Sequence, residues 1–253
     1  MAGTVAVGSD SSVRWITGFL DSPSRAAEAF WQAATGSGLS PRRGPGGEFA
    51  TLLPGGGDAY LRVQVVGDDG PARAHLDLHV ERVAAQARRV VGLGAVVVHD
   101  EDDLVVLRSP TGLLFCLVAW HGEAVRPEPV SWPGGRSLVD QWCLDIPAAS
   151  FEAEADFWAA VTGWARRSGS RPEFDFLVRP DGMPLRLLLQ RTGDAASGMH
   201  PDLASDDRHA EVARHEGLGA SVVRVAESWT TLQDPVGRHY CVTDRNPATG
   251  GLG

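Results

Sequence analysis

Short stretches of alternating apolar and polar residues recur along the chain, and each group of them begins with a strand pattern followed by an amphipathic helix pattern. In the first half we predict strands at 13–20, 48–53, 59–66, 74–80, 95–98, 104–108 and 113–119, and helices at 24–35 and 81–91. The first helix begins after Ser22-Pro23 and ends at Gly36, as helix-starting proline and helix-ending glycine predict. This order corresponds to two consecutive strand-helix-strand-strand-strand units.

One apolar stripe identifies the second predicted helix. It consists of Val83, Ala87, Val90 and Val91, which share one helical face. We therefore expect this face to pack on the sheet.

The second half repeats the first. Residues 30–36 recur at 157–163, 75–78 at 200–203, 92–95 at 217–220, and 107–116 at 232–241. A spacing of roughly 125 residues is far longer than the repeats of solenoid proteins and matches the size of a domain. We predict an α+β chain with two tandem domains at 13–121 and 137–246, a Pro/Gly-rich linker at 122–136, and flexible tails at 1–12 and 247–253.

The composition excludes several classes of function. All 23 basic residues besides histidine are arginines, which excludes lysine Schiff-base chemistry and the Gly-Lys-Ser/Thr phosphate loop. The formal charge of −9 disfavours nucleic acid and anionic membrane as partners. Three widely spaced cysteines, no signal-peptide pattern and no long apolar run predict a soluble, cytoplasmic protein.

Several of these features together resemble a known superfamily. The paired units, the Phe-Trp helix followed by Thr-Gly, and Asp234-Pro-Val-Gly237 before the last strand resemble the vicinal oxygen chelate superfamily. Its members include glyoxalase I, bleomycin-resistance proteins and extradiol dioxygenases, and the similarity is greatest to the glyoxalase-like domains common in actinobacterial proteins. It covers 13–120 and 137–245. The resemblance implies that each half folds from two βαβββ units into a cupped mixed sheet whose concave face binds a small molecule or a metal.

Strand alternation predicts which side chains line each cup. His75, Asp77 and His79 share one face of their strand, while the leucines between them face the helices. The same parity turns His200 and Asp202 inward in the second half. We expect the histidines either to act on a ligand or to make a structural hydrogen bond.

The resemblance also implies where metal ligands would lie. Carried over by position, the sites are Arg14, Gln64, His75 and Cys116 in the first half and Gln141, Gln190, His200 and Cys241 in the second. The family's acidic ligand lies four residues after the glycine of Asp-Pro-x-Gly, where this chain has Cys116 and Cys241. We therefore predict no cofactor, with a divalent metal on His200 and Cys241 as the alternative in the second half. The two cysteines are otherwise small buried hydrophobic residues.

We thus predict a metal-free protein that binds a hydrophobic metabolite or drug in a concave sheet. The alternatives are a metal-independent enzyme that uses His75, His200, Asp77 or Asp202 as general acid or base, and a metal-dependent lyase, isomerase or dioxygenase. The halves are expected to form an intramolecular pseudo-dimer, with a homodimer as a further option. The first cup is expected to hold an anion on Arg14 and Arg62, unless Arg14 pairs with a nearby acid such as Asp77.

Overall fold

The structure of the chain, a computed structural model, describes residues 13–67 and 70–251. In the first half the elements are β1 (Val13–Ser22), η1 (Arg25–Ala27), α1 (Glu28–Thr35), β2 (Gly38–Leu39), β3 (Phe49–Leu53), β4 (Leu61–Val65), β5 (Arg73–Val80), α2 (Val83–Gly92), β6 (Val96–Glu101), β7 (Leu104–Arg108) and β8 (Leu114–Ala119). In the second half they are β9 (Val130–Trp132), β10 (Gly135–Pro147), η2 (Ala148–Ser150), α3 (Phe151–Thr162), β11 (Arg166–Ser168), β12 (Phe174–Leu177), β13 (Arg186–Thr192), β14 (Gly198–Ser205), α4 (Arg208–Gly217), β15 (Ser221–Val225), β16 (Trp229–Gln233) and β17 (His239–Thr243).

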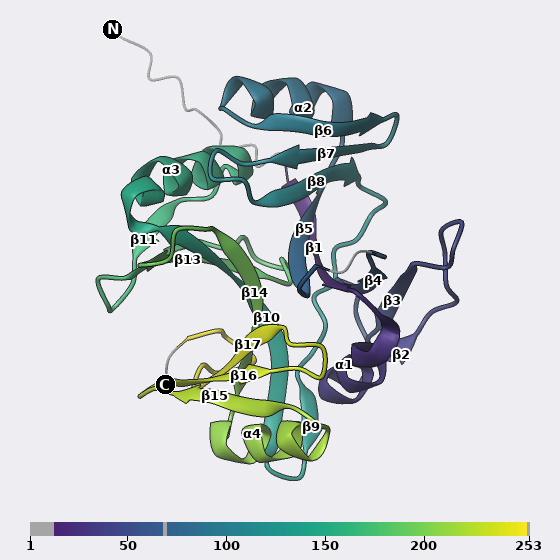
Figure 1. The fold of residues 1–253 in the computed structure, drawn as a ribbon, viewed down its shortest axis with the longest axis vertical. Helices are drawn as coiled ribbons and strands as arrows, with labels where there is room; N and C mark the ends of the chain where they lie inside the picture. The colour runs from purple at the N-terminus through teal and green to yellow at the C-terminus, as the bar shows by residue number, and fades with distance from the viewer. Residues whose placement is uncertain (1–12, 68–69, 252–253) are drawn as a thin grey trace, which may run out of the picture.

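Each half forms one mixed sheet (Figure 1). The strand orders are β2-β3-β4-β1-β5-β8-β7-β6 and β11-β12-β13-β10-β14-β17-β16-β15, with β9 added beside β10. In each sheet the two units meet where their first strands pair antiparallel, β1 with β5 and β10 with β14. The predicted α+β fold with two tandem domains of paired βαβββ units is confirmed.

Several details differ from the sequence prediction. The short strands β2 and β9 were not predicted, and β9 lies within the segment expected to be only a linker. In α2 the side chain of Val91 is exposed, and the buried stripe is completed by Gln86 instead. Of the two predicted tails, 1–12 lies outside the described residues, whereas 247–251 form a hydrogen-bonded turn on Asn246.

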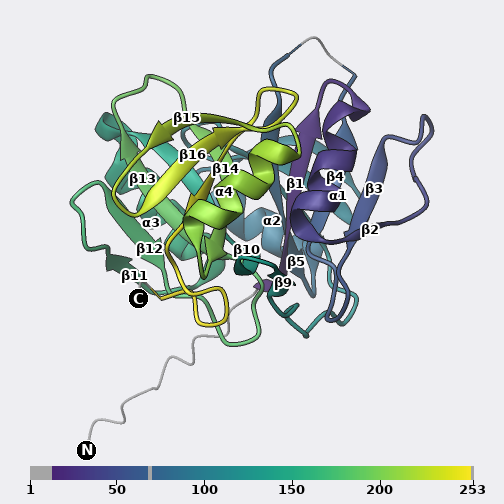
Figure 2. The ribbon, with the colours of Figure 1, turned by 90° about the horizontal axis from the view of Figure 1, so that it is seen from below.

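The two halves pack as an intramolecular pseudo-dimer in which helices from different halves lie side by side (Figure 2). Arg89 of α2 donates to the carbonyl oxygens of Ala160 and Val161 at the C-terminal end of α3. Arg214 of α4 makes the equivalent bonds to Ala33 and Ala34 of α1. A guanidinium there satisfies carbonyls that the helix leaves free and complements the negative end of the helix dipole.

A second pair of contacts between the halves comes from the turn before the last strand of each. In the second half, Asp234 accepts a hydrogen bond from the indole of Trp31 in α1 at 2.8 Å. In the first half, the amide of Thr111 donates to Glu154 of α3, which also accepts from Trp158. Both tryptophans are fully buried.

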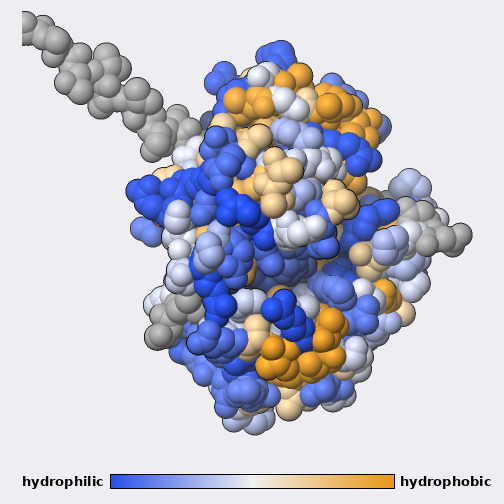
Figure 3. All heavy atoms as spheres, turned by 60° about the vertical axis from the view of Figure 1, so that its left-hand side comes forward, coloured by the Kyte–Doolittle hydropathy of each residue, from blue (hydrophilic) through white to orange (hydrophobic). Residues whose placement is uncertain are grey.

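Hydrophobic surface gathers on the outer edge strands. The exposed valines of β6 and β15 form two patches at the top and bottom of the molecule, with a polar recess between them (Figure 3). Within the described segments, no helix has the length and apolar character needed to span a membrane.

Glu211 accepts a hydrogen bond from Arg214, the residue of α4 that contacts α1, and it makes the stability of the protein depend on pH. Burial opposes its charge, but hydrogen bonds from Arg214, His215 and Ser137 lower its pKa from 4.5 to about 2. As the pH falls, the unfolded chain therefore takes up this proton first, so the stabilisation is complete above about pH 4.5 and is lost toward pH 2. A shift of this size corresponds to roughly 3 kcal/mol.

We expect the Glu211→Gln variant to lose less stability than the parent protein between pH 5 and pH 3, because glutamine does not titrate. Urea denaturation at a series of pH values measures this difference. Glu216→Gln, an exposed change in the same helix, is the control and should follow the parent. Parallel pH profiles for Glu211→Gln and the parent would refute the assignment.

Candidate functional site

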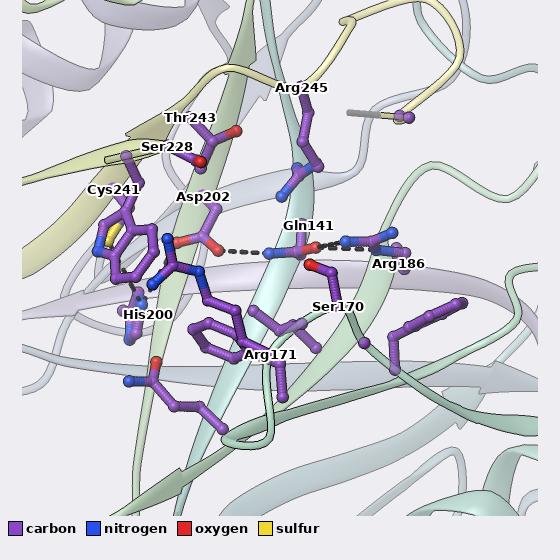
Figure 4. A pocket seen from close by; sticks show the side chains of 18 of the residues that line it. Gln141, Ser170, Arg171, Arg186, His200, Asp202, Ser228, Cys241, Thr243 and Arg245 are labelled. Carbon is purple, nitrogen blue, oxygen red and sulfur yellow. Dashed lines mark hydrogen bonds and ion pairs between the residues drawn. The ribbon is translucent and has the colours of Figure 1, made fainter. Parts of the chain in front are cut away.

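The concave face of the second sheet, which we call the second cup, encloses a cavity of about 290 Å³ (Figure 4). Its walls are largely aromatic and apolar, contributed by Phe174, Phe176, Leu188 and Trp229. Its polar lining comprises Gln141, Ser168, Ser170, Arg171, Arg186, Gln190, His200, Asp202, Ser228, Cys241, Thr243 and Arg245. An apolar cleft with a few convergent polar groups is the usual form of a small-molecule site.

His200 lies at the centre of the polar lining. Its Nδ1 lies 3.0 Å from Oδ2 of Asp145, and its Nε2 lies 3.3 Å from Oδ1 of Asp202. Burial disfavours a charged imidazole, yet Cys143 and the carboxylates of Asp202 and Asp145 raise the pKa of His200 well above its ordinary value. Asp145 fixes the ring orientation, while Nε2 is turned toward Asp202 and Cys241 (Figure 4).

Asp202 supplies the carboxylate of the second cup. Burial alone would raise its pKa, but the charge of His200 and a hydrogen bond from Gln141 lower it. Gln141 can donate to Asp202 because its amide oxygen accepts from Arg186 at 2.8 Å. Oδ1 of Asp202 is buried and has no hydrogen-bond partner within the described part of the chain. Its nearest charged partner is Nε2 of His200, at 3.3 Å.

Two cysteines flank His200. Cys143 pairs with His200 across β10 and β14, and its Sγ donates to Oε1 of Gln190 at 3.4 Å. Sγ of Cys241 lies 3.8 Å from Nε2 of His200. Burial raises the pKa of both thiols, so each is protonated in the absence of a metal. One ligand atom each from Cys143, His200 and Asp202 lies within 4.8 Å of the others.

The first cup contains a similar group but little space. His75, Asp77 and Cys116 also place ligand atoms within 4.8 Å of one another. However, the ring of Phe19 stacks on His75 with a centroid distance of 4.4 Å, and Arg62 lies over that ring. Phe19 pairs with His75 and Arg62 in the ladder, whereas Cys143 pairs with His200 and Leu188. At these two positions the first cup therefore has Phe19 and Arg62, which are larger than the Cys143 and Leu188 of the second cup.

The electrostatics of the first cup also differ. Nδ1 of His75 lies 2.7 Å from Asp21, and although burial lowers the pKa of His75, the Asp21 carboxylate raises it. Arg62 lies 3.8 Å from Asp77, which leaves less negative charge for a cation. Cys116 is buried, and burial raises the pKa of its thiol.

The structure brings most of the predicted site residues together. Gln141, Gln190, His200, Asp202 and Cys241 all line the second cavity. Gln64 is the first-half counterpart of Gln190, since they pair with Asp21 and Asp145 respectively.

Arg14 does not join the first cup. It is exposed, forms an ion pair with Glu81 at 2.6 Å rather than with Asp77, and lies over Trp120. The first-half counterpart of Gln141 is Thr17, because Thr17 pairs with Asp77 as Gln141 pairs with Asp202.

The sequence analysis missed several residues of the second cup. Cys143 and Asp145 lie two and four residues after Gln141 on the same strand face, so strand alternation could have identified both. Phe174, Phe176 and Trp229 come from strands at opposite sides of the sheet, and their approach across the cup depends on sheet curvature.

The chain was compared with known proteins. The family model described as a glyoxalase-like domain matches residues 19–118 and 141–243. The search of curated proteins found no match.

Similar solved structures include three proteins with TM-scores near 0.6. A fusion of a xylose isomerase-like TIM barrel with a 4-hydroxyphenylpyruvate dioxygenase is 15% identical, with a TM-score of 0.61 over 96% of this chain and 50% of that one. A halotolerant catechol dioxygenase is 15% identical, with a TM-score of 0.60 over 92% of this chain and 87% of that one. The Mn(II)-bound glyoxalase of Novosphingobium aromaticivorans is 16% identical, with a TM-score of 0.60 over 92% and 81%. The chain thus spans only half of the first of these proteins, and the likeness to all three is one of fold.

The prediction of no cofactor is wrong. It rested on the cysteines at 116 and 241, where the family has a carboxylate, but Asp77 and Asp202 supply carboxylates two residues after each histidine. Each cup thereby gains a group of three residues that could hold a metal ion, and the structures of similar fold include one with bound Mn(II).

Proposed function

Because this chain belongs to the glyoxalase-like domain family of the vicinal oxygen chelate superfamily, we propose that its second half binds a small planar molecule beside a divalent metal ion. The observation that carries the proposal is an aromatic-walled cavity of about 290 Å³ whose lining includes His200 and Asp202, two members of a three-residue donor group completed by the buried Cys143.

The donor chemistry of this group favours a metal of zinc type. Cys143 offers sulfur, His200 nitrogen and Asp202 oxygen, and three protein ligands with one open position are typical of zinc sites that bind a further molecule. Asp145 would orient His200 as the outer carboxylate of a carboxylate-histidine-metal arrangement. Oδ1 of Asp202, which forms no hydrogen bond and has only His200 as its ion-pair partner, supports the same assignment. When bound, such an ion supplies Lewis acidity to a ligand oxygen.

The walls favour an aromatic ligand. Trp229 and Phe174 pack edge to face at 5.7 Å, and Phe176 lies under Arg186. Flat rings in the ligand would stack against these side chains and bury apolar surface.

We expect the purified protein to bind about one equivalent of Zn²⁺ tightly, and His200→Gln to weaken that affinity by about 100-fold or more, since it removes the imidazole ligand. Because the ligands must lose protons, the affinity should fall as the pH is lowered. Calorimetric titration with ZnCl₂ measures both effects. His75→Gln is the matched control, because Arg62 already offsets the charge of Asp77. Equal Zn²⁺ affinity in the parent and His200→Gln would refute the site.

The ligand half of the proposal has its own test. Titration with 1-naphthol should give one binding site in the parent, and Trp229→Ala should weaken binding by about tenfold through loss of ring contact. Trp120→Ala in the first half serves as the control. The absence of 1-naphthol binding, with or without Zn²⁺, would contradict the proposal of an aromatic-binding cup.

A further inference from the structure

Four arginines from separate segments meet at one end of the second cup, and we call them the arginine cluster. They are Arg126 of the inter-domain segment, Arg179 after β12, Arg186 at the start of β13 and Arg245 after β17. Figure 4 shows Arg186 and Arg245 near Gln141, with Arg245 above it and Arg186 beside it. The four side chains are also close enough to interact through their charges. The charge of Arg245 lowers the pKa of both Arg186 and Arg179, and the charge of Arg126 lowers that of Arg179.

The charge of this cluster is only partly balanced. Arg245 forms an ion pair with the buried Asp140, and Asp181 lies exposed at the rim. The other guanidiniums donate to neutral oxygens: Arg126 to Pro247 and Ala248, Arg179 to Pro184, and Arg186 to Gln141. Four cations therefore face two carboxylates, a net charge of +2. The next carboxylate, Asp202, is paired with His200.

Some of the donors are buried and unused. Nε of Arg245 and Nε of Arg126 have no hydrogen-bond partner in the described ranges, and the Arg245 side chain is 5% exposed. Burial, reinforced by the charge of Arg245, lowers the pKa of Arg186 to about 10. Burial and Arg126 likewise lower the pKa of Arg179. Buried like charges with spare donors are stabilised by an anion.

The space beside the cluster adjoins the ligand cavity, and Arg186 and Arg245 of the cluster line that cavity directly. A second cavity of about 420 Å³ is lined by Arg126, Arg179 and Arg186, with Asp140 and the turn at 248–250. The two cavities share Arg186, Phe176 and Gly250. A group attached to a molecule in the first cavity can therefore reach the cluster.

We propose that the arginine cluster binds a carboxylate or phosphate group of the molecule held in the second cup, an inference that rests on the proposed function. The ligand class is an aromatic acid or aromatic phosphate ester. Its ring lies against Phe174, Phe176 and Trp229, and its anionic group accepts charge-assisted hydrogen bonds from Arg186 and its neighbours.

The test compares 1-naphthol, 1-naphthoate and 1-naphthyl phosphate by calorimetry, with chelator present so that no metal binds the anions. In the parent, the better anion should bind about tenfold or more tightly than 1-naphthol. Arg179→Gln and Arg186→Gln should each remove most of this advantage, and Arg179→Gln, whose side chain does not line the ligand cavity, should leave the affinity for 1-naphthol nearly unchanged. These two arginines are chosen because neither neutralises the buried Asp140. Arg167→Gln, an exposed change on β11, is the control.

The outcomes separate the two proposals. Equal affinity for all three probes, or an anion advantage that survives both substitutions, overturns the role of the arginine cluster while the cup remains a binding site. If none of the probes binds, the proposed function fails and this inference fails with it. A preference for 1-naphthyl phosphate over 1-naphthoate, or the reverse, identifies which anion the cluster accepts. If Arg186→Gln does not fold, Arg179→Gln alone decides, since its side chain bonds only a backbone oxygen among the described contacts.

Discussion

Replacing Asp234 with alanine is expected to lower the free energy of unfolding by about 3–5 kcal/mol. The Asp234 carboxylate accepts hydrogen bonds from the Trp31 indole at 2.8 Å and from Nη1 of Arg238 at 2.7 Å. Both charged side chains are buried, and Arg238 also donates to backbone oxygens of Asp21 and Arg73 in the other half. Removing the acid leaves a buried guanidinium and an indole N–H without their acceptor.

Urea denaturation followed by circular dichroism measures this loss. Asp206→Ala is the matched control, since its ion pair with Arg136 is at the surface and should contribute no more than about 1 kcal/mol. A loss for Asp234→Ala as small as that of the control would mean that the contact between the halves does not depend on this ion pair.

The role of Asp234 shows what the sequence could not reveal. Asp234-Pro-Val-Gly237 was noticed only as a mark of resemblance, because its partner Trp31 lies in the other half of the chain. The equivalent turn in the first half has Ser109 in place of the acid and docks on Glu154 instead. The repeat predicts that the two halves meet in similar ways, but not which residue supplies the carboxylate.

The fold itself was readable because its signals are local. Strand alternation around His75 correctly separates a polar face from the buried Leu76 and Leu78, and the repeat transfers that facing to His200. These patterns depend only on residues that are neighbours in the sequence, so the packing of distant segments does not change them.

The misplacement of Arg14 has a geometric cause. The sequence prediction placed Arg14 and Gln141 at corresponding positions of the two halves, but the ladder matches Gln141 with Thr17. Both β1 and β10 also have register shifts, at Val13/Trp15 and Val139/Gln141, which alternation cannot detect. Register with the neighbouring strand, rather than sequence order, decides which side chain faces a cup.

The metal prediction failed for a related reason. It considered only the family position for the acid, which is cysteine in both halves, and not the acid two residues after each histidine. In the structure, Nε2 of His200 and Oδ1 of Asp202 converge to 3.3 Å because their side chains tilt toward each other. Distances between Cα atoms on a strand do not limit side chains of this length.

Phe19 and Arg62 of the first cup occupy the positions of Cys143 and Leu188 in the second, and exchanging these pairs is expected to change ligand binding strongly. The Cys143→Phe/Leu188→Arg double variant places in the second cup the residues that fill the first, Phe19 and Arg62. We expect it to lose detectable binding of 1-naphthol, since the new ring would stack on His200 as Phe19 does on His75. Calorimetry in chelator measures this directly. Cys143→Ala removes the thiol but keeps the space, so it should retain 1-naphthol binding.

The reciprocal Phe19→Cys/Arg62→Leu variant tests the same idea as a gain of function. It removes the ring that stacks on His75 and the guanidinium beside Asp77, so the first cup should open and 1-naphthol should bind at two sites per chain instead of one. Loss of the large ring is expected to lower the free energy of unfolding by about 3–5 kcal/mol, so folding is checked by circular dichroism before titration.

A folded Phe19→Cys/Arg62→Leu variant that still binds one equivalent would show that Phe19 and Arg62 are not what closes the first cup. Binding that persists in Cys143→Phe/Leu188→Arg would place the ligand outside the second cup. Two substitutions in each half therefore decide whether the duplication carries two latent sites of which only one is open.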